Sequence, residues 1–463
     1  IFTCIGTALS TVVIPLYVGH KAVGEEQKAK YFADNIITVS TVLTFILVIV
    51  GMCIAPLLVN FTGFAKDDAS RSYAVKSLMI VMPVMFFYAW NYIFQGMLQS
   101  CGRYKLPAFV SVPSSLIVIA YVLFLSDRFG VTGLLFATVA GLAMQALILV
   151  PPLIKEGYRY RTVFKLNDPD IINAAKMAVP VLVGVGAYQL NMLFNSTMIA
   201  RCDKTMVTIL TFVQNITIQM VLAFVYSITA VIYPKLTQSA AVGDMDGYKL
   251  TLCQILKNVS IMLIPISIGY ISVRGPLLNL LVAWGKVSAA SVSKAETFLS
   301  LYAVGIFGIG LKEILDRALY SVKNTKVSAV NGIFIMIVNV ALSLILINFI
   351  GAYGIPLAYS VSSLAGCANL LWQLKRKVGP YAHGMGAEII KSLLAAGIMF
   401  ACVFGINRAS DIFLISDGLF IRLVKLAVPA FCGVIVYAVF AYVFKCETVR
   451  TFSASVFAKL KRR

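Results

Sequence analysis

The chain has 463 residues, of which 60% are hydrophobic and 13% are charged, and its formal net charge at pH 7 is +20. A soluble domain has about 45–50% apolar and about 25% charged residues, so this composition excludes an ordinary soluble protein. The positive charge does not indicate a nucleic-acid-binding protein, because the basic residues lie in short loops between long apolar runs, where they orient a membrane protein.

Apolar runs long enough to cross a bilayer recur from one end of the chain to the other. A transmembrane helix needs about 20 mostly apolar residues. We therefore predict an all-α polytopic membrane protein with thirteen spans, at residues 1–19, 35–59, 74–100, 108–126, 131–154, 171–200, 205–234, 250–274, 296–320, 327–350, 354–374, 387–407 and 417–445. Pro83, Pro180 and Pro265 fall inside these spans and are expected to bend them.

Lysine and arginine are distributed unevenly between alternate loops. One set of loops, together with the C-terminal tail, holds most of them. Cytoplasmic loops carry such an excess, so the C-terminus is predicted to lie inside. With thirteen spans, Ile1 is then expected outside.

A short basic turn occurs twice. "LQSCGRYKLPA" (Leu98–Ala108) and "LYSVKNTKVSA" (Leu319–Ala329) share Leu, Ser, Lys and Ala at a constant offset of 221, and Gly133 and Gly354 keep the same offset. Matching turns lie on the same side of the membrane, which indicates a parallel repeat with an even number of helices in each unit. Because the second unit shows six helices and the first shows five, we expect that one N-terminal helix is absent and that the full protein has fourteen.

The predicted organisation follows from this repeat. It comprises an N-terminal lobe lacking its first helix (1–154), a cytoplasmic linker between the lobes (155–170), a C-terminal lobe (171–376), a C-terminal helix pair (387–445) and a basic cytoplasmic tail (446–463). The nine cysteines are scattered and form no CxxC pattern, so no metal site is predicted. No nucleotide-binding loop of the GxxxxGK[ST] type occurs, so direct ATP coupling is not expected.

Polar side chains inside apolar spans are the first places to look for a transport site. Thr211, Asn215 and Gln219 lie near one helical face at i, i+4 spacing, and Asn191 and Asn195 form a similar face in the preceding span. In a transporter with a parallel repeat these two helices are the first two of the second lobe, and they are expected to face its cavity. Hydrogen bonding to a sugar or phosphate and hydrogen bonding between helices both remain open.

Two further groups are candidates. Asn91, Gln95 and Gln99 form one polar stripe at i, i+4, i+8, for which cavity lining and lobe packing are both open. Lys312 and Asp316 can pair at i, i+4, next to Arg317. This cluster is either a cationic lip or gate for a head group, or a snorkelling cluster near the membrane interface, and we favour the second interpretation.

Several stretches resemble the MurJ/MviN family of lipid II flippases, which belongs to the superfamily of multidrug (MATE) exporters and polysaccharide flippases. They are "GTALSTVVIPLY", "QGMLQSCGRYKLPA", "VIYPKLT", "LYAVGIFGIGLKEILDRALYSVKNTKVS" and "GAYGIPLAYSVSSL", and their order and spacing cover nearly the whole chain. The resemblance implies fourteen helices, with two lobes of six around a central cavity. It also implies a C-terminal pair that helps to form a groove for the lipid tail.

The resemblance also implies a function. Arginines in the cavity of this family meet the pyrophosphate of an undecaprenyl-linked precursor, and outward and inward openings alternate. We therefore expect a monomeric transporter of the bacterial inner membrane, not an enzyme, which contacts membrane lipids and a lipid-linked oligosaccharide but no nucleic acid. No cofactor is expected, and coupling to an ion or to the membrane potential is left open.

The sequence departs from the family pattern at the expected site. Asn215 stands where the family usually has a cavity arginine, Gln214 at the adjacent acidic position, and Asn195 where an aspartate is frequent, whereas Arg317 matches a recurring arginine. An arginine fork binds phosphate bidentately, but asparagine offers only neutral hydrogen bonds. Lipid II is the first substrate hypothesis, another lipid-linked oligosaccharide such as a capsule, exopolysaccharide or O-antigen unit is the second, and a drug/cation antiporter is the third.

Overall fold

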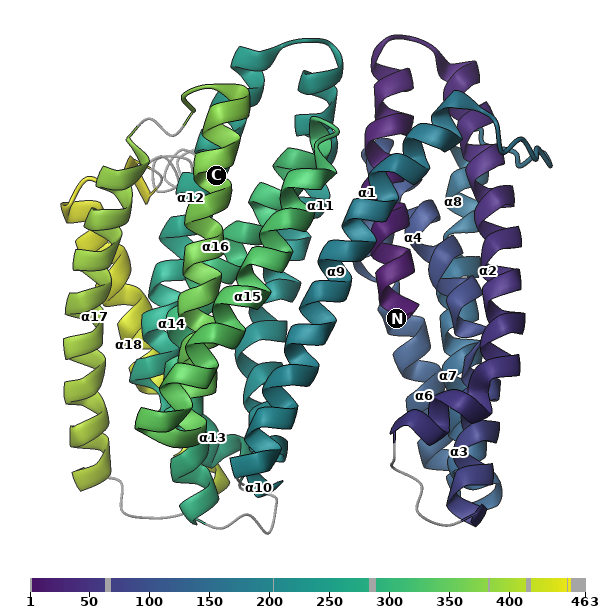
Figure 1. The fold of residues 1–463 in the computed structure, drawn as a ribbon. Coiled ribbons are helices and arrows are strands. Elements are labelled where there is room, and N and C mark those ends of the chain that lie inside the picture. Colours follow the sequence, from purple (N-terminus) through teal and green to yellow (C-terminus); the bar gives the residue numbers. More distant parts are fainter. Residues whose placement is uncertain are drawn as a thin grey trace. The chain divides into compact units, whose positions relative to one another are not determined.

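The computed structural model describes residues 2–62, 68–202, 204–282, 289–381, 384–413, 418–447 and 449–450 (Figure 1). Every regular element among these residues is helical. The α-helices are α1 (Phe2–Ala22), α2 (Glu26–Thr62), α3 (Asp68–Val81), α4 (Val84–Ser100), α5 (Lys105–Ala108), α6 (Ser111–Phe124), α7 (Ser126–Ile148), α8 (Val150–Lys155), α9 (Pro169–Cys202), α10 (Lys204–Gln214), α11 (Met220–Ala241), α12 (Met245–Ser272), α13 (Arg274–Val282), α14 (Ala289–Ser321), α15 (Thr325–Ile350), α16 (Gly354–Val378), α17 (Met385–Phe413) and α18 (Leu419–Val443).

Most of these helices are long and apolar. Within the described residues, 11 helical segments meet the length and hydropathy expected of a membrane span, and one of them, Thr325–Val378, contains both α15 and α16. The prediction of an all-α polytopic membrane protein is therefore confirmed. The bend expected at Pro83 appears as a break between α3 and α4, because proline lacks the N–H that would continue the helix.

One span differs from its predicted form. Residues 205–234 were expected as a single helix, but α10 and α11 are joined by a π-helical turn at Asn215–Gln219. A π-turn inserts an extra residue into one helical turn and commonly marks a functional position. Periodicity arguments assume 3.6 residues per turn, so they do not detect such a turn.

The chain forms two compact units. Unit 1 comprises Ile1–Gly186, Ser227–Asp244 and Leu319–Ala329, and unit 2 comprises Ala187–Tyr226, Met245–Ala318 and Val330–Arg463. The helices α9, α11, α14 and α15 each contribute residues to both units.

The core of unit 1 surrounds the hairpin of α1 and α2. Its buried apolar residues come from α1, α2, α4, α8 and the first turns of α9, with Phe32, Ile93 and Met97 almost fully buried. Inside a membrane such side chains favour association of helices through van der Waals packing, because lipid tails are as apolar as the side chains themselves. A second cluster of unit 1 joins Tyr233 to α1, and the Tyr233 hydroxyl donates to the Thr11 carbonyl oxygen at 2.6 Å.

Two apolar cores lie among the described residues of unit 2. One packs the C-terminal pair, α17 and α18, against α12, and there the Tyr437 hydroxyl donates to the Ile261 carbonyl oxygen at 2.7 Å. The other joins α14 to α16, where Gly305 and Gly308 allow close approach of the backbones. A Cβ atom on Gly308 would lie 2.8 Å from the Leu364 backbone nitrogen. Small residues permit such packing between membrane helices.

The linker between α8 and α9 is bound along α2. Asp34 Oδ1 accepts hydrogen bonds from the Tyr158 hydroxyl at 2.7 Å and from the Arg161 backbone N–H at 3.1 Å. Asn35 bonds both the N–H and the carbonyl oxygen of Lys165, at 3.0 and 2.9 Å. Burial and the bond to Asp34 raise the pKa of the Tyr158 hydroxyl, so it remains a donor at neutral pH. The linker is therefore an ordered part of unit 1.

Candidate functional site

The amide side chains of α4 belong to a hydrogen-bonded chain inside unit 1. Asn91 Nδ2 donates to Gln145 Oε1 on α7 at 2.7 Å, and Gln95 Nε2 donates to Asn91 Oδ1 at 2.7 Å. Gln145 Nε2 donates in turn to Ser114 Oγ on α6 at 2.6 Å. Asn91 is buried, whereas Gln95 and Gln99 are half-buried. The chain ties three helices together, and its two ends, Gln95 and Ser114, are half-buried, whereas Asn91 and Gln145 between them are buried.

The predicted asparagines of α9 meet a third asparagine in unit 2. Asn339 Nδ2 on α15 donates to Asn191 Oδ1 at 2.6 Å and to Asn195 Oδ1 at 2.8 Å. All three side chains are buried. Hydrogen bonds of this kind hold helices together inside a membrane. These contacts make the cluster a packing element between α9 and α15.

The polar stripe of the next span lies differently. Thr211, Asn215 and Gln219 are all exposed, and the last two begin and end the π-helical turn. The Thr211 hydroxyl donates to the Val207 carbonyl oxygen of its own helix at 3.0 Å. Gln214 turns away from this stripe and donates to the Tyr302 hydroxyl at 2.9 Å. The five candidates of these two helices therefore separate into a buried pair, Asn191 and Asn195, and an exposed stripe.

Helix α14 carries two interleaved ion pairs. Lys312 Nζ lies 2.6 Å from Asp316 Oδ2, and an Arg317 guanidinium nitrogen lies 3.2 Å from Glu313 Oε1. Both pairs have i, i+4 spacing, and Asp316 is buried. The four charges sum to zero. An anion that approaches either cation therefore also meets a carboxylate of the same helix.

Groups from three other helices surround these charges in unit 2. Tyr188 on α9 and Tyr226 on α11 lie within electrostatic reach of Lys312 and Glu313. Cys367 on α16 lies within reach of Asp316. The ion pairs therefore lie among hydroxyl and thiol groups rather than against apolar side chains alone.

Two residues of these networks, Gln145 and Asn339, are not among the candidates predicted from the sequence. Each is an isolated amide in an apolar span, which is a usable signal. Their partners are 54 and 144 or more residues away, however, and periodicity within one helix does not identify such partners.

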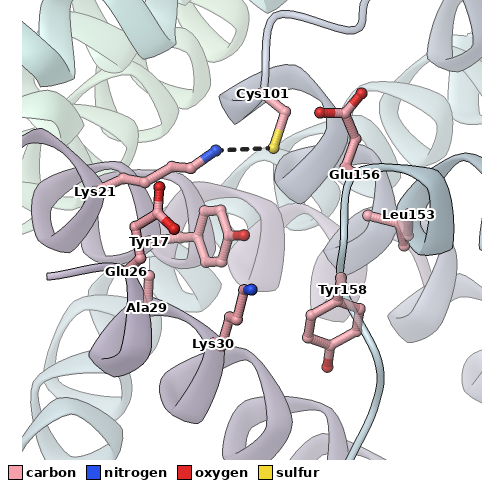
Figure 2. A pocket seen from close by; sticks show the side chains of 9 residues that line it. All are labelled: Tyr17, Lys21, Glu26, Ala29, Lys30, Cys101, Leu153, Glu156 and Tyr158. Atoms are coloured by element: carbon pink, nitrogen blue, oxygen red, sulfur yellow. Dashed lines mark hydrogen bonds between the residues drawn. The ribbon is translucent and has the colours of Figure 1, made fainter. Parts of the chain in front are cut away.

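A small polar pocket opens near the end of α1 in unit 1 (Figure 2). Lys21 Nζ donates to Cys101 Sγ at 3.3 Å across it. Its volume is about 60 Å³. Because one water occupies about 30 Å³ in the liquid, this pocket is too small for the head group of a lipid-linked sugar. It is lined by Tyr17, Lys21, Glu26, Ala29, Lys30, Cys101, Leu153, Glu156 and Tyr158.

The part of the chain that the structure describes contains no group of three or more His, Cys, Asp or Glu side chains suited to a metal ion. The polar groups described above are chiefly amides, hydroxyls and paired charges. Such groups bind by hydrogen bonds and exchange of ion pairs, and they form no arrangement of nucleophile, base and oxyanion donors.

Known proteins resemble the chain over most of its length. The family profile for "Lipid II flippase MurJ" matches residues 1–446. A probable lipid II flippase MurJ of Bdellovibrio bacteriovorus is 23% identical over 433 residues, which cover 91% of this chain and 81% of the relative. One from Rickettsia prowazekii is 23% identical over 452 residues, which cover 95% and 87%.

Solved structures agree on the fold. A lipid II flippase MurJ in an inward closed conformation aligns with a TM-score of 0.67 at 20% identity, over 96% of this chain and 89% of that one. A MATE transporter of Vibrio cholerae in its bent form aligns with a TM-score of 0.68 at 12% identity, over 84% and 86%. At such identities the structural likeness concerns the fold alone, whereas the family profile covers nearly the entire sequence. The chain belongs to the family of MurJ lipid II flippases.

Proposed function

We propose that the chain flips lipid II, the undecaprenyl-pyrophosphate-linked precursor of peptidoglycan, across the bacterial inner membrane. The observation that carries this function is the match of the lipid II flippase profile to residues 1–446. A protein of this family is a transporter and not an enzyme. The C-terminus is placed in the cytoplasm, in keeping with the positive-inside bias. The proposed transporter acts as a monomer.

The physical task explains the architecture. The head group of lipid II carries sugars and a pyrophosphate, and each polar group without a partner in hydrocarbon costs several kcal/mol. Two lobes that open alternately to either side supply hydrogen bonds during the crossing, while the tail remains in lipid. The exposed stripe of Thr211, Asn215 and Gln219 supplies neutral donors and acceptors for this purpose, assisted by the half-buried Gln95 and Gln99.

The charges of α14 are proposed to meet the pyrophosphate. Arg317 and Lys312 are each paired with a carboxylate in the structure, so the phosphate either shares these cations with Glu313 and Asp316 or replaces them as the partner. Exchange of one anionic partner for another avoids an unpaired buried cation, which would be strongly unfavourable.

Lipid II accessibility tests the function. A strain whose own lipid II flippase can be depleted is complemented with this chain, and lipid II on the outer face of the inner membrane is quantified. We expect complementation to restore external lipid II to the level before depletion. Unchanged low external lipid II, with the protein present in the membrane at normal amounts, would contradict the proposal.

Arg317 gives a test of the site. Arg317→Gln is expected to lower flipping at least ten-fold, whereas Arg317→Lys keeps the charge and retains part of the activity. Lys326→Gln, which removes an exposed charge in the first turn of α15, is the matched control and is expected to flip normally. Equal activity of Arg317→Gln and the control would show that the α14 charges do not contact the substrate.

A second candidate function is supported by Asn215. This exposed side chain replaces the arginine expected from the family, and a neutral amide suits sugar hydroxyls better than a phosphate. The alternative is a flippase for another lipid-linked oligosaccharide, such as a capsule, exopolysaccharide or O-antigen unit. Deletion that abolishes a surface polymer but leaves peptidoglycan synthesis intact would favour it.

In addition, Asn215→Arg is expected to raise lipid II flipping if this position meets the pyrophosphate.

A further inference from the structure

The linker exposes large apolar and basic side chains although it lies outside the membrane spans. Phe164 and Leu166 are 52% and 55% exposed, and Tyr160 is also exposed. Arg159, Arg161 and Lys165 alternate with them and are exposed as well, and Tyr158–Asn167 contains no acidic residue. Exposed apolar side chains in a loop commonly mark a contact surface for a membrane or a protein.

The backbone of this segment is already bound. Asp34 accepts from the Arg161 N–H, Asn35 bonds both polar groups of the Lys165 backbone, and the hydroxyls of Thr38 and Tyr160 lie 2.8 Å apart. Tyr160 contacts α2 through its hydroxyl and is still 49% exposed, and the exposed side chains of Phe164, Lys165 and Leu166 are carried by a backbone that is bound to α2. Because they are presented by an ordered backbone, little conformational entropy is lost when they bind a partner.

The contacts on α2 also set the depth of the linker. The first exposed large apolar side chain of α2 after these contacts is Val42, followed by Leu43, Phe45 and Ile46. At 1.5 Å per residue, Val42 lies about 10 Å along the helix from Asn35 and about 6 Å from Thr38. The interfacial region on each side of a bilayer is about 5–8 Å thick, so the linker at Thr38 lies at head-group depth and the linker at Asn35 lies at the outer edge of that layer.

A groove adjoins this surface. It has a volume of about 540 Å³ and is bordered by Tyr31 and by the linker from Phe164 to Pro169. Asp168 is the acidic residue in its lining, and its carboxylate already accepts the backbone N–H of Asp170 at 2.9 Å. Lys165 supplies a cation at the rim, and aromatic and aliphatic side chains supply apolar walls.

We propose that the linker surface formed by Arg159, Tyr160, Arg161, Phe164, Lys165 and Leu166 binds anionic phospholipid head groups at the membrane interface. Aromatic side chains favour the interface, and each basic side chain near an anionic leaflet is attracted to it. Large apolar and basic side chains alternate here on a backbone that is hydrogen-bonded to α2. This combination distinguishes the surface from an ordinary hydrated loop. The positive-inside bias assigns it to the cytoplasmic leaflet.

Depth-resolved fluorescence quenching tests the proposal on the full-length protein in vesicles. A fluorescent amino acid is incorporated in place of Leu166, or in place of Val23, an exposed residue of the turn between α1 and α2, as a matched control. We expect brominated lipid to quench the label at position 166, and aqueous iodide to quench the label at position 23. Quenching of both positions by iodide alone would overturn the proposal.

The charge requirement is tested with the same label. Brominated phosphatidylglycerol is expected to quench position 166 more strongly than brominated phosphatidylcholine at equal content. Combining Arg159→Gln, Arg161→Gln and Lys165→Gln should lower the preference for phosphatidylglycerol by about five-fold per residue removed. The charge-conserving set Arg159→Lys, Arg161→Lys and Lys165→Arg should retain it. An equal preference in the Gln and charge-conserving variants would show that the basic residues do not bind the head group.

Neither measurement requires transport. The lipid contact can therefore fail while the chain still flips lipid II, and flipping can fail while the contact is intact.

Discussion

Helices α4 and α14 occupy matching places in the predicted repeat but satisfy their polar side chains in opposite ways. On α4, Asn91 and Gln95 are neutral, and their chain of bonds continues to α7 and α6. On α14, the polar groups are charged, and each cation bonds a carboxylate one turn away on the same helix. The polar groups of α4 thus join three helices of unit 1, whereas the ion pairs of α14 form along a single helix.

The largest expected effect comes from breaking a charge pair of α14. Asp316→Ala leaves the Lys312 ammonium without its carboxylate in a partly buried position, and loss of one partner of a buried pair costs about 3–5 kcal/mol. We expect a corresponding fall in the thermal unfolding temperature of the purified protein in detergent. Lys312→Met combined with Asp316→Leu should recover most of the loss, since no unpaired charge remains. Equal instability of the single and double variants would contradict a self-contained pair.

The asparagine cluster of unit 2 is expected to give the next largest effect. Asn339→Ala removes the donor shared by Asn191 and Asn195, and each buried acceptor left without a partner costs about 1–3 kcal/mol. Asn348→Ala is the control on the same helix, because Asn348 is exposed and donates only to the Leu344 carbonyl oxygen one turn away. Chemical denaturation in detergent should separate the two variants, and indistinguishable midpoints would argue against a packing role.

The outer end of the α4 chain is expected to matter less for stability. Gln95→Ala removes a half-buried donor, and a hydrogen bond between side chains inside a membrane averages about 0.6 kcal/mol. If Gln95 also contacts substrate, the flipping rate will fall more than the stability. Measuring both on one preparation sharpens the contrast between α4 and α14. A stability loss as large as that of Asp316→Ala would remove the contrast.

The smallest expected effect comes from an exposed ion pair, which gives a reference for the ion pairs of α14. Lys257 on α12 bonds Glu447 at 2.9 Å, but Glu447 is largely exposed, so Glu447→Gln should cost below about 1 kcal/mol. The Lys257 ammonium lowers the pKa of Glu447 in the folded protein. This contribution is therefore present above the ordinary pKa of glutamate and is lost as the pH falls through the lowered value. The difference in unfolding midpoint between wild type and Glu447→Gln should vanish in acid, and a difference that grows in acid would contradict this.

The sequence was informative wherever a single strong physical effect decides the local structure. Hydrophobic runs must cross the bilayer as helices, because the backbone finds no other hydrogen-bond partners there, and Pro83 ends a helix for a local chemical reason. The resemblance to the family was recognised from ordered motifs such as "LYAVGIFGIGLKEILDRALYSVKNTKVS". Intrahelical spacing also brought Lys312 and Asp316 together.

The sequence was less informative where partners are distant. The burial of Asn191 and Asn195 depends on Asn339, which lies on another helix. The exposure of Asn215 and Gln219 is linked to a π-turn that has no signature in the periodicity. The fold of the linker depends on Asp34 and Asn35, more than a hundred residues earlier. In each case a side chain is satisfied by a tertiary contact, and composition does not encode which contact forms.

The ordered linker has a mechanical consequence. A linker of this length without such contacts would leave its two ends free to move relative to each other. This one is hydrogen-bonded to α2 up to Lys165, so its backbone is held in place along α2. The helix that follows the linker, α9, runs without interruption from residues of unit 1 to residues of unit 2, with the boundary between Gly186 and Ala187. Pro180 removes one backbone hydrogen bond a few residues earlier. Bending of α9 is therefore expected near Pro180.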